Sequence, residues 1–73
     1  MRINEAIRQL MKDLGIRQLD MATAIGKSKA TDVGARLAMK NMSIDKALEM
    51  LDVLGYEIVI RPKGGEGEVI VID

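Results

Sequence analysis

The spacing of apolar residues changes once along the chain, at Tyr56, and this change limits the possible fold more than any other feature. Before Tyr56 the apolar residues recur at intervals of three and four, which is the spacing of helices with one buried face. After Tyr56 they alternate or run together among β-branched residues, which is typical of strands. The sequence therefore predicts a mainly α fold that ends in a β-hairpin.

Four helices are expected in the first part of the chain. Gly15, Gly26 and Gly55 stand after three of them, where a left-handed residue commonly ends a helix. Asn4 and Ser43 have short polar side chains that suit the start of the first and fourth helices. The expected helices span residues 4–14, 17–25, 29–39 and 43–54.

The hairpin is expected to have strands over 56–61 and 68–72, joined through a turn that begins at Pro62. Both strands carry apolar side chains on both faces over part of their length. A hairpin that covers one side of a helical core needs only one apolar face, so the second face needs another partner. We expect the strands to pair or stack with those of a second subunit, through Tyr56, Ile58, Ile60, Val69, Ile70, Val71 and Ile72.

With 73 residues, the chain is expected to form a single domain, residues 1–73. A domain of this size buries only about 60% of the surface that its unfolded chain exposes, so it is marginally stable alone. The sequence has no cysteine and no histidine, which leaves neither a disulfide nor an ordinary zinc site to stabilise it. A homodimer is the simplest source of further stability.

Several classes of function are not expected. Without histidine, cysteine or a metal-ligand cluster, an enzyme is improbable, and no cofactor or metal is predicted. No apolar run approaches the length of a membrane span, and residues 1–5 lack the apolar core of a signal peptide. We therefore expect a cytoplasmic protein with no membrane partner.

Charge is unevenly distributed although the net charge is zero. Residues 1–40 hold eight basic and four acidic residues, a net charge of +4, whereas residues 41–73 hold three basic and seven acidic residues, a net charge of −4. Such polarity suits a protein that presents one end to an anion such as the phosphate backbone of DNA.

Residues 17–41 have the layout of a helix-turn-helix: a short helix, a glycine, a polar turn and a second helix. Only Val33 and Leu37 of the second helix form an apolar stripe, and its other side chains are mostly small. In a helix-turn-helix the first helix crosses the phosphate backbone and the second lies in the major groove. A face of small side chains can approach such a surface closely.

The order Arg17-Gln18-Leu19-Asp20-Met21-Ala22-Thr23-Ala24-Ile25-Gly26, followed by Val33, Leu37 and Asn41, resembles the phage-repressor-like (Xre or Cro/repressor) helix-turn-helix family. Residues 41–62 also look like the fourth helix and the following strand of its short members, so the resemblance covers about residues 4–62. One residue more than in the family pattern separates Gly26 from Val33. The turn is therefore longer here, or the helix starts later.

The resemblance implies a sequence-specific, dimeric regulator of transcription, a repressor, that binds double-stranded DNA. The positions that match the family imply contacts to bases by Lys29, Thr31 and Ala35. They imply contacts to phosphates by Arg17, Gln18, Lys27, Ser28, Arg36, Lys40 and Asn41.

A second hypothesis gives the same scaffold to protein binding, as in an antitoxin-like, antirepressor or anti-CRISPR inhibitor. It is favoured by the zero net charge, by Asp32 and by the small side chains near the expected reading position. The charge polarity, Gln18 and the family resemblance favour the DNA-binding regulator, which we take as the first hypothesis.

Overall fold

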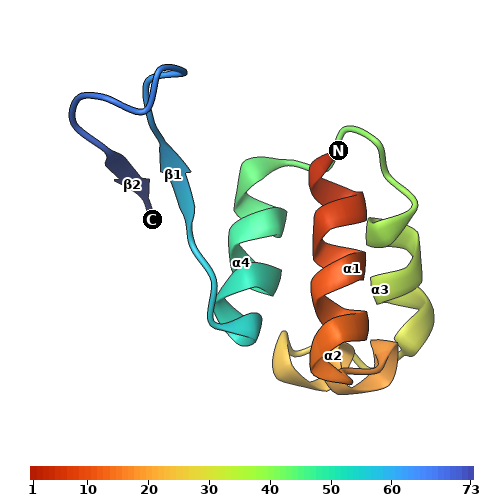
Figure 1. Cartoon of the computed structure of the whole chain (residues 1–73). Coiled ribbons are helices and arrows are strands. Elements are labelled where there is room, and N and C mark those ends of the chain that lie inside the picture. The colour runs from red at the N-terminus through yellow and green to blue at the C-terminus, as the bar shows by residue number, and fades with distance from the viewer.

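The computed structural model describes all 73 residues and contains four helices followed by a two-stranded antiparallel hairpin, as the sequence predicts (Figure 1). The helices are α1 (Ile3–Leu14), α2 (Gln18–Ala24), α3 (Ala30–Leu37) and α4 (Ile44–Leu54). The strands are β1 (Ile58–Ile60) and β2 (Ile70–Ile72), in the register Ile58 to Ile72, Val59 to Val71 and Ile60 to Ile70. None of the helices combines the length and the apolar character that a membrane span requires.

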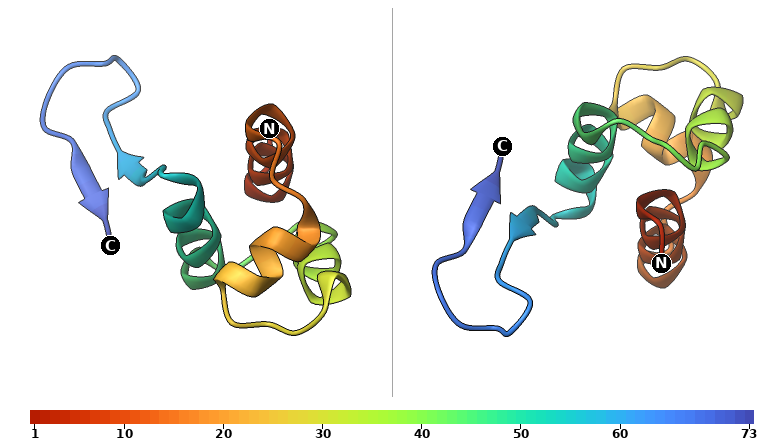
Figure 2. Two further views of the ribbon diagram at one scale, coloured as in Figure 1. Left: turned by 90° about the horizontal axis from the view of Figure 1, so that it is seen from below. Right: turned by 90° about the horizontal axis from the view of Figure 1, so that it is seen from above.

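The helices form one body, and the hairpin extends from its side. In Figure 1, α1 lies between α3 and α4, and α2 crosses below them. Both views of Figure 2 place the hairpin beyond α4, on the side away from α1 and α3. The N-terminal half of α1 lies near the C-terminal end of α3, where side chains of α1 contact the carbonyl of Leu37. The helical body is thus covered by the hairpin on one side only.

The core contains eleven buried hydrophobic residues from all four helices and the segment before α4. Four of them are methionines, and none is aromatic. Unbranched methionine side chains adapt to irregular gaps, which suits a small body whose helices are short. The buried residues are Ile7, Met11, Met21, Ala22, Val33, Leu37, Met42, Ala47, Met50, Leu51 and Leu54.

The strands are shorter than the expected spans 56–61 and 68–72, for reasons found at both ends of β1. The backbone N–H of Tyr56 donates to the carbonyl of Leu51 at 2.9 Å, as part of the turn that ends α4, so Tyr56 is not part of the strand. At the other end, Pro62 has no N–H to donate, and its carbonyl accepts from the Gly65 N–H at 3.0 Å in the turn. The bounds of the four helices differ from the expected ones by one or two residues.

Asn4 does not begin α1, contrary to the expectation from the sequence. The helix starts at Ile3, and the Glu5 carboxylate accepts from the Arg2 backbone N–H at 3.0 Å. Asn4 is buried, and its Nδ2 donates to the Leu37 carbonyl at 2.9 Å, to which Arg8 also donates at 3.2 Å. The last carbonyls of a helix lack partners within it, so these side chains satisfy the end of α3. Asn4 therefore fixes α1 against α3.

Replacing Asn4 by alanine is expected to lower the free energy of unfolding by about 1–3 kcal/mol, because it removes a buried hydrogen bond between two helices. In a domain of this size each kcal/mol lowers the melting temperature by about 4–8 °C. Thermal unfolding followed by circular dichroism measures the change. Gln9→Ala is the matched control, since Gln9 bonds only to exposed Asp13 on the same helix. Equal melting temperatures for the two variants would show that Arg8 alone satisfies Leu37.

Candidate nucleic-acid interface

A five-residue turn, residues 25–29, connects α2 to α3. Gly26 adopts a left-handed conformation with φ of 78°, and the Lys27 N–H donates to the Ala22 carbonyl at 2.7 Å to close the end of α2. Helix α3 begins at Ala30, one residue later than expected from the sequence. The extra residue between Gly26 and Val33 is thus taken up before the helix starts.

The outer face of α3 consists of small, exposed residues. Val33 and Leu37 point into the core, whereas Thr31, Ala35 and Ala38 are exposed along one side of the helix. Lys29, also exposed, precedes the first residue of α3. The three residues expected to contact bases therefore lie on an accessible surface at and beyond the start of α3.

Gln18 contacts α3 at a glycine. A Cβ atom added to Gly34 would lie 3.1 Å from the Gln18 Oε1 atom, which is a close contact. Gln18 is the first residue of α2, so the missing side chain at position 34 gives the start of α2 room beside α3. Gln18 therefore lies beside the helix that carries Thr31 and Ala35.

Replacing Gly34 by alanine is expected to raise stability and weaken any DNA binding that uses Gln18. Alanine favours the helix by about 1 kcal/mol over glycine, which corresponds to about 4–8 °C in melting temperature. The Gln18 side chain is exposed and can move by the few tenths of an ångström that the new methyl group needs. This movement shifts the Gln18 amide away from its position in the unaltered protein. Melting curves and DNA titrations of G34A and of G34A combined with Q18A measure both effects. A lower melting temperature for G34A alone would mean that Gln18 cannot move.

Arg17 forms an ion pair with Asp20 at the start of α2. Its Nε and Nη2 donate to the two carboxylate oxygens at 3.0 and 3.1 Å, and its backbone N–H donates to Oδ2 at 3.0 Å. The side-chain hydrogen bond, followed by the backbone one, lowers the pKa of Asp20 below its ordinary value. The pair therefore contributes stability above the ordinary carboxyl pKa and loses it as pH falls through the lowered pKa, a small effect for exposed groups. A phosphate would compete with Asp20 for Arg17.

Arg36 links α3 to α4. Its Nη1 lies 2.7 Å from the Glu49 Oε1, and its side chain is only 12% exposed. Arg36, which was expected to contact a phosphate, is thus already paired with a carboxylate within the chain. This ion pair links α3 to α4. Replacing Arg36 would change the position of α3 as well as the surface charge.

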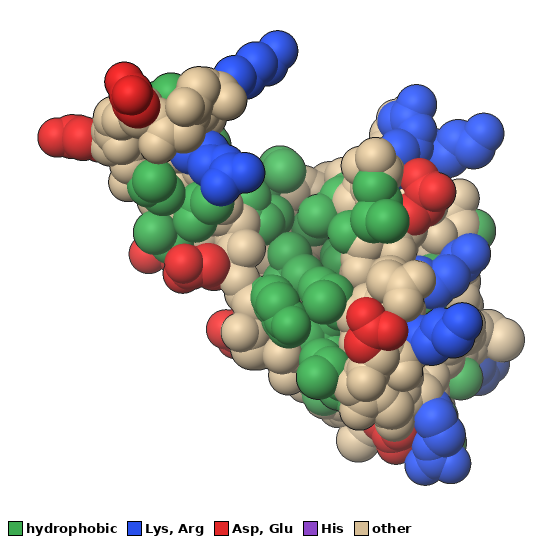
Figure 3. All heavy atoms as spheres, in the orientation of Figure 1, with side chains coloured by type: hydrophobic (Ala, Val, Ile, Leu, Met, Phe, Trp, Pro, Cys, Tyr) green, Lys and Arg blue, Asp and Glu red, His purple; other side chains and the backbone are tan.

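The other expected phosphate contacts lie in the segments at the two ends of α3. Lys27 and Ser28 are exposed in the turn before it, and Lys40 and Asn41 are exposed in the loop after it. Figure 3 shows Lys and Arg side chains along the edge of the helical body that is remote from the hairpin. Cationic groups are therefore available on both sides of the small-residue face.

Arg2 and Arg8 also lie near the end of α3, although sequence reasoning did not assign them a role. With Lys40 they line a hollow of about 430 Å³ at the C-terminal end of α3. Arg2 Nη1 lies 3.5 Å from the Lys40 carbonyl, 38 positions away in sequence. No local spacing signals such a contact, since it depends on how α1 packs against the end of α3.

The apolar residues expected at a dimer interface lie on the hairpin or, in the case of Tyr56, between α4 and β1, and most of them are exposed. Ile58 packs against the core and Ile72 is half-buried. The other five remain exposed: Tyr56, Ile60, Val69, Ile70 and Val71.

Comparison of the chain with protein-family models, with curated proteins and with solved structures finds no match. The assignment of a function therefore rests on the geometry of the chain itself.

Proposed function

We propose that the protein binds double-stranded DNA as a dimer, with α3 in the major groove, and that it acts as a sequence-specific repressor of transcription. The observation that carries the proposal is the small exposed face of α3, a helix that lies beside α2 and is ion-paired to α4. Gln18 lies against Gly34, and Arg36 is paired with Glu49 on α4. A rigidly supported helix with a free outer face is what readout in the groove requires.

The dimensions of α3 and of the groove agree. A helix with its side chains is about 10–12 Å across, close to the roughly 12 Å width of the major groove. The side chains at Thr31 and Ala35 are short and exposed, so the helix axis can come near the base edges. The Thr31 hydroxyl can serve a donor or an acceptor on a base, while the Ala35 methyl can contact a thymine methyl. Lys29 can reach guanine from the start of the helix.

Phosphate contacts follow from the residues beside α3. Gln18, Lys27 and Ser28 precede the helix and Lys40 and Asn41 follow it, so both groove walls have polar partners. Arg2 and Arg8 line one hollow with Lys40 and add two further cations near it. Binding that rests on several such contacts falls steeply with added salt, because each neutralised phosphate releases a counterion.

A second copy would double the contact surface. Helix-turn-helix dimers place their reading helices one turn of DNA, about 34 Å, or a multiple of it apart, on a palindromic site. The exposed apolar residues of the hairpin are the surface on which we place this dimer contact. Burying them against a partner also adds stability to a chain whose own core has only eleven hydrophobic residues.

Selection of bound sequences from a random pool of duplex DNA tests the proposal. A two-fold symmetric site should be enriched, and the logarithm of its affinity should fall linearly with the logarithm of salt concentration. Lys40→Ala should weaken binding to all sequences, whereas Thr31→Ala should change the preference at one base pair. Failure to enrich any sequence would contradict the proposal.

Asp32 favours a second candidate function, protein binding by the same surface. It is exposed in the first turn of α3, where a carboxylate would repel phosphates unless it accepts from cytosine. If the surface binds a protein and not DNA, Asp32→Ala will not strengthen DNA binding, because no duplex is bound at all. A DNA-binding protein should instead bind every duplex more tightly when this charge is removed.

A further inference from the structure

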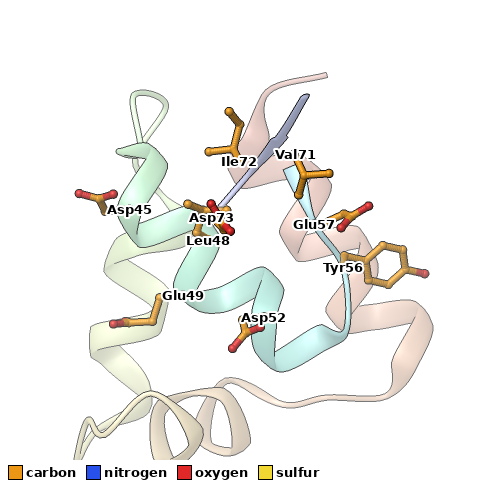
Figure 4. A pocket seen from close by; sticks show the side chains of 9 residues that line it. All are labelled: Asp45, Leu48, Glu49, Asp52, Tyr56, Glu57, Val71, Ile72 and Asp73. Carbon is orange, nitrogen blue, oxygen red and sulfur yellow. The ribbon is translucent and has the colours of Figure 1, made fainter. Parts of the chain in front are cut away.

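An acid-lined hollow of about 630 Å³ lies between α4 and the hairpin (Figure 4). Its lining includes five carboxylates, from Asp45, Glu49, Asp52, Glu57 and Asp73, and the apolar side chain of Leu48. No lysine or arginine lines it, and its carboxylates do not converge into a metal-binding group. Only Glu49 has a cationic partner within the chain. The hollow therefore suits a cationic segment with some apolar surface.

The tip of the hairpin carries such a segment. Arg61 and Lys63 lie on the arm that leaves β1, whereas Glu66 and Glu68 lie on the arm that returns to β2. All four are exposed, and none forms an ion pair within the chain. Behind the tip, Val59 and Val71 pair across the strands with their side chains exposed. The hairpin thus combines an uncovered apolar centre with one basic and one acidic arm.

We infer that a second copy of this chain fills the hollow, with Arg61 and Lys63 of each hairpin tip against the carboxylates beside the other hairpin's base. This rests on the dimer of the proposed function but not on DNA binding. We place the two-fold axis through the apolar centre and perpendicular to the strands, which reverses the strand direction, so the tip of one hairpin lies beside the base of the other. Lys63 stands four residues beyond Val59, at the start of the turn, so its backbone lies at most about 13 Å from that of Val59.

The charges select one orientation of the two hairpins. The tip as a whole is neutral, so attraction requires its basic arm to face the hollow and its acidic arm, Glu66 and Glu68, to face solvent. The same arrangement covers the exposed apolar centre of each hairpin, a two-stranded unit that is marginal without a further layer. The apolar contact supplies most of the affinity, and the ion pairs fix the direction.

Charge reversal on the full chain tests the arrangement, with dimerisation measured by sedimentation equilibrium. R61E combined with K63E should raise the dimer dissociation constant at least about tenfold at low salt, and less at high salt. The matched control, E66K combined with E68K, should leave the constant within about threefold. Mixing the R61E/K63E chain with a D45K/D52K chain should restore association between the two. All six positions are exposed, and circular dichroism checks that each variant folds.

Three outcomes would overturn the inference. If both reversed pairs act alike on a dimeric protein, the dimer stands but its tips do not occupy the hollows. If the mixed chains fail to associate, the carboxylates are not the partners of the tip. If the unaltered protein stays monomeric at all concentrations, the dimer of the proposed function fails as well, while binding of a single DNA half-site remains open to its own test.

Discussion

Replacing Ala35 by glutamate is expected to abolish specific DNA binding without unfolding the protein. The position is exposed on the outer face of α3, and glutamate is a good helix former, so the fold has little reason to change. In the groove the new carboxylate would face acceptors and nearby phosphates without a partner. An unpaired charge of this kind costs about 3 kcal/mol or more, a loss of at least about a hundredfold in affinity.

The control for this variant is Gln9→Glu, which adds the same charge at an exposed position of α1. Fluorescence anisotropy of labelled duplex DNA gives both affinities, and melting curves give the stabilities. The control should bind within a few fold of the unaltered protein. If Ala35→Glu binds as tightly as the control, α3 does not enter the groove, and the proposed reading face is wrong.

Replacing Ile7 by alanine is expected to have the largest effect on stability. Ile7 is a fully buried residue of the core, and truncation of such a residue costs about 2–5 kcal/mol through lost burial and the cavity left behind. The whole domain is expected to have only about 4–11 kcal/mol, at about 0.05–0.15 kcal/mol per residue. The variant should therefore lose about half of its stability and be partly unfolded well below the melting temperature of the parent.

Leu14→Ala is the matched comparison, since Leu14 lies on the same helix but is 48% exposed. Urea unfolding of both variants gives the free energies directly. Leu14→Ala should cost less than about 1 kcal/mol. Similar losses for the two variants would mean that the centre of the core lies elsewhere.

The order of elements was predictable because each element has its own local signal. The helical spacing of five apolar residues predicts α4, and three of them are buried, whereas Leu48 is half-buried and Ile44 is 53% exposed at the start of the helix; the five are Ile44, Ala47, Leu48, Leu51 and Leu54. The narrow stripe of Val33 and Leu37 predicted which side of α3 faces inward, and both are buried. These predictions were confirmed because a repeating pattern of apolar residues has only a few ways to be buried.

The contacts between elements were less predictable. Asn4 has a side chain that suits a helix cap, yet its Nδ2 donates to the carbonyl of Leu37, 33 positions away in sequence, at the C-terminal end of α3. Arg36 has the position of a surface cation, but its partner Glu49 lies on α4. The spacing of residues along one helix does not indicate which residue of another helix will lie beside them. The sequence therefore predicted which residues of the candidate site are exposed, such as Thr31 and Ala35, but not that Arg17 and Arg36 are paired with carboxylates.

The composition of the core has an optical consequence. Four methionines and several aliphatic residues fill the centre, and Tyr56 is the only aromatic residue of the whole chain. Tyr56 stands where α4 passes into the hairpin, half exposed beside the acid-lined hollow. Near-ultraviolet absorption and intrinsic emission of this protein thus arise from one ring at one junction. Folding of the helices is nearly silent at these wavelengths, whereas the environment of the hairpin is visible without any label.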